Sequence, residues 1–63
     1  MNRYRAYVDG KFIGSELSKN AAQALILEAG EKLPAGSDVS FQLKLGKEVV
    51  GEGRLEVEAY RGV

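Results

Sequence analysis

The chain has 63 residues, with nine basic and nine acidic side chains, and it contains neither cysteine nor histidine. This length allows a single domain, which we expect to span residues 1–63 around a thin hydrophobic core. The missing residue types exclude zinc fingers, Cys-His and Ser-His-Asp catalytic groups and proton transfer by imidazole. We therefore expect no enzymatic activity, no metal and no other cofactor.

The lack of cysteine also removes disulfides, which small secreted domains use to offset a thin core. Residues 1–5 lead into alternating polar and apolar side chains, without the apolar run that is typical of a signal peptide or a membrane span. The sequence therefore predicts a cytoplasmic protein that does not bind membranes.

The first predicted element is a β-hairpin. Residues 3–8 alternate polar and apolar side chains, and the pair Asp9-Gly10 separates them from residues 11–13. An Asp-Gly pair between two such segments is the strongest short-range hairpin signal that a sequence offers. We expect a turn of two residues at this pair.

The length of this turn decides which side chains share a face, because directly paired residues point to the same side of a sheet. A two-residue turn would pair Ala6 with Ile13 on the core side. The same turn would pair Tyr7 with Phe12 on the other side. The sequence thus predicts an aromatic pair on the sheet face that points away from the core.

A helix is predicted after the first hairpin. Ser18 is a favourable N-cap, and residues 21–33 have high helix propensity. Because Pro34 disfavours helical backbone at the residue before it, the helix is expected to stop before Pro34. Leu27 falls on the solvent side of this helix. The apolar residues that recur at the spacing of one helical face are Ala22, Leu25, Ile26, Ala29 and Leu33.

A second hairpin is predicted after the helix. Residues 39–45 show clear strand alternation, and residues 49–60 form the last strand. A two-residue turn would place Glu52 opposite Phe41 and bury a carboxylate. A three-residue loop over 46–48 keeps the core side apolar, so we favour it. The pairs expected from this loop are Leu45 with Val49, Phe41 with Gly53 and Val39 with Leu55.

Two hairpins that flank one helix predict an α+β fold of ββαββ order, with a mostly antiparallel four-stranded sheet and the helix on one face. The small immunoglobulin-binding domains of bacterial surface proteins have a similar element order, and their opening hairpin resembles residues 4–11 of this chain. The resemblance implies a β-grasp arrangement, in which the first and last strands are adjacent. Such an arrangement would pair basic residues with acidic ones across these strands: Arg3 and Arg5 with Glu56 and Glu58.

With one helix, one face of the sheet stays open. Strand alternation predicts that it carries aromatic, basic and acidic side chains, namely Arg3, Arg5, Tyr7, Phe12, Gln42, Lys44, Val50, Arg54, Glu56, Glu58 and Tyr60. Because Tyr and Arg are enriched at binding hot spots, part of this face is a candidate binding surface. The candidate residues are Arg3, Arg5, Tyr7, Phe12, Arg54 and Tyr60. The alternative interpretation is a solvated face with ordinary cross-strand ion and aromatic pairs.

The expected partner is another protein, because the neutral net charge disfavours affinity driven by phosphates. Nucleic acid is the alternative partner, since aromatic and basic residues on an open sheet can bind single strands. Residues 8–22 also resemble the junction of hairpin and helix in double-stranded-RNA-binding domains, although the lysine run that such domains place at the helix start is reduced to Lys19. If the face around Leu27 also binds, the chain would form a homodimer.

The sequence therefore predicts a small non-enzymatic protein-binding module that acts through its open sheet face or a strand edge. Short chains of this kind are often accessory or inhibitory factors, for example ones encoded by phages. A designed or purely structural domain without any partner is a third interpretation.

Overall fold

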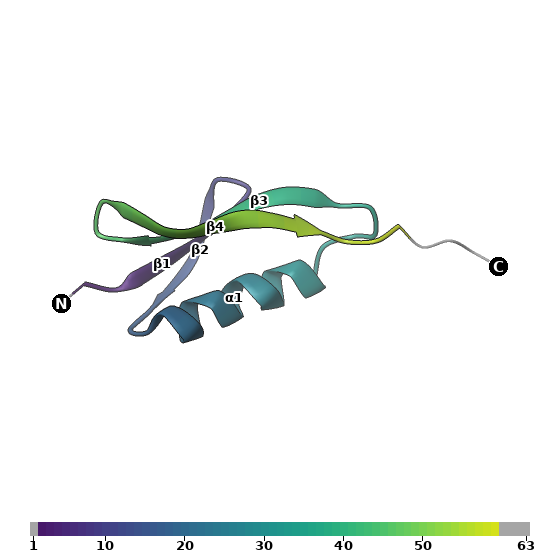
Figure 1. Cartoon of the computed structure of the whole chain (residues 1–63). Coiled ribbons are helices and arrows are strands. Elements are labelled where there is room, and N and C mark those ends of the chain that lie inside the picture. The colour runs from purple at the N-terminus through teal and green to yellow at the C-terminus, as the bar shows by residue number, and fades with distance from the viewer. Residues whose placement is uncertain (1, 60–63) are drawn as a thin grey trace.

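The computed structural model describes residues 2–59, in which one helix covers one face of a four-stranded sheet (Figure 1). All neighbouring strands are antiparallel. The α+β class and the ββαββ order are thereby confirmed. The elements are β1 (Tyr4–Val8), β2 (Lys11–Glu16), α1 (Lys19–Glu31), β3 (Asp38–Leu45) and β4 (Glu48–Glu56).

The strand order in the sheet is β2-β1-β3-β4. The first strand therefore pairs with the third, and the expected β-grasp arrangement is wrong. A physical reason lies in the side chains that face the helix. At the centre of the sheet, β3 has Phe41 and Leu43 on that side, and the residues of β4 opposite them are Gly53 and Gly51. The larger side chains of β4 on that side, Val50 and Leu55, lie on either side of these glycines. Since the central position lies under the helix, the strand with the larger apolar side chains fills it better.

The first hairpin turns at Asp9 and Gly10, as predicted. Both residues have positive φ, 53° and 76°, as a two-residue turn of type I′ requires. Tyr7 pairs with Phe12 beside this turn, so the expected aromatic pair is confirmed.

Further from the turn, this hairpin contains a β-bulge. Ala6 pairs with Gly14, and Ile13 is the additional residue of β2, so the expected pairing of Ala6 with Ile13 is wrong. Ile13 is 37% exposed. Close packing explains the glycine, because a Cβ atom at Gly14 would lie 2.9 Å from Cδ1 of Leu25 on the helix. The bulge thus places the residue without a side chain under α1.

The second hairpin also combines a two-residue turn with a bulge. Gly46 and Lys47 form the turn, so the three-residue loop is wrong. Val50 is the additional residue of β4; it packs against the core, whereas it was expected on the open face. Val49 takes the open face and is 45% exposed. The bulge restores the register that the longer loop would have given, and two predicted pairs are confirmed: Phe41 with Gly53 and Val39 with Leu55.

Helix α1 begins as the sequence predicts and ends two residues earlier than Leu33. The Oγ atom of Ser18 accepts a hydrogen bond from the N–H of Ala21 at 3.1 Å, which is an N-cap contact. At the other end, the N–H of Leu33 donates to the carbonyl of Gly30, so the chain closes a tighter turn before Pro34.

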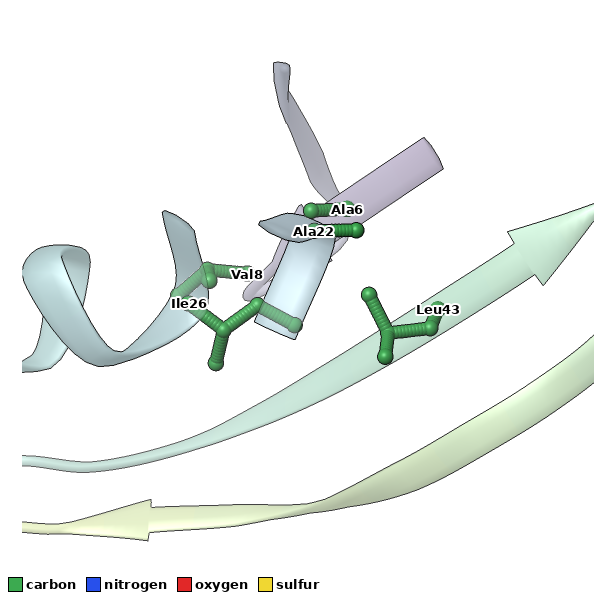
Figure 2. Close-up of a cluster of buried hydrophobic side chains, with 5 residues drawn as sticks. All are labelled: Ala6, Val8, Ala22, Ile26 and Leu43. Carbon is green, nitrogen blue, oxygen red and sulfur yellow. The ribbon is translucent and has the colours of Figure 1, made fainter. Parts of the chain in front are cut away.

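The helix packs over β1, β2 and β3 and leaves β4 largely uncovered. Figure 2 shows the buried side chains between the helix and the central strands. Ala6 and Ala22 are both fully buried, and their small size allows a close approach of α1 to β1. Ile26 and Leu43 are the largest of the fully buried side chains. The buried apolar residues are Ala6, Val8, Ala22, Ile26 and Leu43.

Replacement of Ile26 by Ala tests this core. It should lower the free energy of unfolding by about 2–5 kcal/mol, because it leaves a cavity that the four remaining buried residues cannot fill. Urea denaturation followed by circular dichroism measures the effect. Leu17→Ala is the control, because Leu17 is 61% exposed and its truncation should change stability by less than about 0.5 kcal/mol. Equal losses in both variants would contradict this core.

Gly51 and Gly53 of β4 both lie on the helix side of the sheet, so their replacement by alanine compares the packing at the two positions. A Cβ atom at Gly53 would lie 2.8 Å from the Phe41 ring, whereas at Gly51 its nearest neighbour would be Leu43 at 3.4 Å. Gly53→Ala should therefore be less stable than Gly51→Ala by about 1 kcal/mol. Thermal melts of the two variants test this, and the opposite ranking would contradict the Phe41 placement.

Candidate functional site

The sheet face opposite α1, here called the outer face, is defined by the strand registers. It contains Arg3, Arg5, Tyr7, Phe12, Ser15, Asp38, Ser40, Gln42, Lys44, Val49, Glu52, Arg54 and Glu56. The described part of the chain has no second helix to cover it (Figure 1). Of the other expected members, Glu58 follows the end of β4, and Tyr60 lies outside the described residues.

An aromatic pair lies on the β1 and β2 side of the outer face. The ring centroids of Tyr7 and Phe12 are 5.7 Å apart with an interplanar angle of 61°, an edge-to-face arrangement. The ammonium group of Lys44 lies 5.2 Å from the centroid of the Tyr7 ring, which is a cation-π contact. Phe12 is 58% exposed. The pair thus presents Phe12 to solvent while Lys44 covers part of Tyr7.

The aromatic pair borders an open hollow of about 610 Å³ on this face. Arg3 is fixed at its rim by Ser15, because its Nε donates to the Ser15 hydroxyl at 3.0 Å and its Nη2 donates to the Ser15 carbonyl at 3.1 Å. The hollow therefore combines an oriented guanidinium group with exposed aromatic surface. The residues that line it are Asn2, Arg3, Arg5, Tyr7, Phe12, Ser15 and Gly46.

Two basic side chains lie directly opposite each other beside the hollow. Arg5 pairs with Lys44 across β1 and β3, so these like charges are close neighbours on the same face. Within residues 2–59, no acidic side chain forms an ion pair with either of them. We call Arg3, Arg5 and Lys44 the basic cluster.

The other half of the outer face is mainly acidic. Arg54 lies there and donates from Nε to Oδ1 of Asp38 at 2.7 Å. This hydrogen bond, followed by the charge of Asp38, raises the pKa of Arg54 above its ordinary value. Glu52 and Glu56 flank Arg54 along the strand. The zero net charge of the chain thus conceals a face with a basic and an acidic half.

The structure therefore divides the predicted site residues. Arg3, Arg5, Tyr7 and Phe12 line one hollow, whereas Arg54 lies in the acidic half. The expected pairing of Arg3 and Arg5 with Glu56 and Glu58 is wrong, because β3 separates β1 from β4.

Sequence reasoning missed Asn2, Ser15 and Gly46 in the lining of the hollow. A two-residue turn without a bulge would pair Ser15 with Tyr4 on the core side, and the bulge at Ile13 moves Ser15 to the outer face, where it pairs with Arg5. The only signal for that shift is the glycine that follows each bulge residue, Gly14 and Gly51.

Comparison of the chain with protein-family models, curated proteins and solved structures finds no match. In the described residues, no helix has the length and apolar character needed to cross a membrane. Residues 2–59 also contain no group of acidic side chains placed to hold a metal ion. The chemistry of the hollow and of the basic cluster is therefore the basis for any functional assignment.

The like-charge pair of Arg5 and Lys44 gives a test of the site geometry. Arg5→Gln should stabilise the fold by about 0.2–1 kcal/mol at low salt, because it removes the repulsion across the strands. Screening by salt should reduce this difference between variant and wild type. Thermal melts at low and high ionic strength measure it. A loss of stability that is equal at both ionic strengths would contradict the pairing.

Proposed function

We propose that this chain is a non-enzymatic protein-binding module that binds an acidic segment of another protein at the hollow. The observation that carries the proposal is the basic cluster beside the exposed Phe12 ring. Charges that lack a partner within the described chain can be neutralised by carboxylates of a binding partner. A cytoplasmic accessory or inhibitory factor is the role that fits a domain of this size without disulfides.

The side chains of the hollow suit carboxylate recognition. A guanidinium group forms paired hydrogen bonds with a carboxylate, and Arg3 is already held in place by Ser15. Phe12 adds apolar area next to this group, as hot spots of protein interfaces do. Because Phe12 and Ser15 lie on β2 and Arg3 is hydrogen-bonded to Ser15, less conformational entropy is lost when a partner binds. We expect a partner that places an aliphatic side chain beside Asp or Glu.

Nucleic acid fits the same face less well. Lys44 already lies over the Tyr7 ring, which reduces the area on which a base could stack. The acidic half of the face, with Glu52 and Glu56, would repel a phosphate backbone that extends past the hollow. We propose no catalytic step, because the described lining offers the Ser15 hydroxyl no carboxylate or imidazole that could act as its base.

Short peptides that alternate Asp or Glu with Leu can test this proposal, with Asn and Gln versions as matched controls. We expect the acidic peptides to bind, and Phe12→Ala or Arg5→Ala to weaken binding by roughly tenfold or more. Arg54→Ala is the control variant, since Arg54 lies on the same face outside the hollow. Fluorescence anisotropy measures the affinities, and circular dichroism verifies folding.

A single-stranded oligothymidine serves as the competing probe in the same assay. Tight binding of this probe that falls steeply with salt, without binding of the acidic peptides, would favour nucleic acid and contradict the proposal. Equal peptide affinity of Phe12→Ala and wild type would also contradict it.

A further inference from the structure

A second hollow lies on the helix side of the sheet, between α1 and β4. It has a volume of about 340 Å³ and forms because α1 packs over the other three strands. Leu27 projects from the helix beside it and is 59% exposed, although it is a large apolar side chain. Leu55 and Val57 line the strand side and are only half-buried. Gly30, Glu31 and Glu56 complete the lining, with the two glutamates at the exposed rim. We call the apolar part of this hollow, Leu27, Leu55 and Val57, the apolar groove.

The groove runs along an open strand edge. Strand β4 is the longest of the sheet and has a neighbouring strand on one side only within the described residues. The N–H of Val57 donates to Ser37 at 2.8 Å, and its carbonyl accepts from Gly36 at 2.9 Å, so the backbone of Val57 points toward the preceding segment. Because backbone direction alternates along a strand, the backbone groups of Glu52, Arg54 and Glu56 point outward.

The residues of β4 whose backbone groups point outward alternate in charge, as Glu52, Arg54 and Glu56. This alternation suits pairing with a second copy of the same strand. Two copies of β4 can pair in an antiparallel arrangement that leaves both outer faces on the same side of the joined sheet. A two-fold axis at Gly53 then places Arg54 opposite Glu52 of the other copy. An axis at Leu55 places Arg54 opposite Glu56 of the other copy. An axis at Glu52 or Arg54 places like charges opposite each other. Opposite charges across strands stabilise pairing and like charges oppose it, so this edge favours the registers centred on Gly53 and Leu55. Of these two, the register centred on Leu55 brings Leu55 of both copies together, whereas the other places Leu55 opposite Gly51.

We propose that two copies of this chain pair through their β4 edges across a two-fold axis, with the apolar grooves of both copies meeting on the helix side. The result is one continuous antiparallel sheet with both helices on the same face. Two independent features support it, the outward backbone groups of β4 and the exposed apolar groove next to them. A core of five buried residues also leaves the single copy in need of further apolar burial.

The outer face is a poorer surface for self-association. A dimer through that face would bury Arg5 and Lys44, and removal of charges from water is costly even when they are paired. The edge dimer leaves the outer-face hollow of each copy open, so the dimer proposal does not depend on the proposed function.

Sedimentation velocity over a range of concentrations tests the dimer. The wild type should sediment as a species of twice 6.8 kDa. Glu52→Pro should weaken the dimer by roughly tenfold to a hundredfold, because it removes an outward N–H from each copy and leaves the pairing with β3 intact. Glu52→Ala keeps that N–H and is the matched control, which should retain the dimer.

The groove is tested by a second matched pair. Leu27→Asp should give a folded monomer, because it places a charge in the groove. Leu17→Asp should remain dimeric, because Leu17 is equally exposed but does not line the groove. Circular dichroism verifies that each variant is folded.

Three outcomes would overturn the proposal. The first is a wild type that stays monomeric at its highest soluble concentration. The second is a dimer that persists in both Glu52→Pro and Leu27→Asp. The third is a dimer that Phe12→Ala disrupts and these two variants do not, which would place the interface on the outer face.

Discussion

The contact between α1 and the two central strands is the constraint on which the other features depend. Ala22 of α1 and Ala6 of β1 are both fully buried in one cluster, to which Ile26 and Leu43 contribute the largest side chains. Because a single helix must bury the apolar residues of the sheet, most of these residues lie on one side, and Phe12 and Val49 on the other side stay exposed. The opposite side is then free of packing demands and can carry like charges at Arg5 and Lys44, which a two-sided core would not tolerate.

The two hairpins solve the same local problem in the same way. In each hairpin a two-residue turn is followed by two paired residues, then by one additional residue that forms the bulge, and then by a glycine on the helix side. The additional residue and the glycine are Ile13-Gly14 in β2 and Val50-Gly51 in β4. A bulge increases twist and shifts by one which side chains share a face. This shift brings Ser15 to the hollow and Val50 to the core. The position of the bulges therefore determines the composition of both faces.

Local sequence signals were sufficient to predict the fold class, the Ser18 cap and the pairing of Tyr7 with Phe12. Strand alternation and helical spacing indicate the class, the N-cap preference of serine indicates the cap, and the Asp9-Gly10 turn fixes the pair. The bulges were not predictable, because they depend on contacts such as that between Leu25 and Gly14. The strand order depends on which apolar residues best fill the space under the helix, a long-range property. Arg54 was accordingly grouped with Arg3, although the order of the strands places them in opposite halves of the outer face.

The basic half of the outer face is, we propose, a preformed site for an acidic segment of another protein. Amide chemical shifts recorded while an acidic, leucine-containing peptide is added to ¹⁵N-labelled protein test it most directly. We expect saturable shifts at residues around the hollow, such as Arg5, Phe12 and Ser15, with little change along β4. Shifts confined to the β4 edge, or the absence of saturable shifts at the hollow, would contradict it.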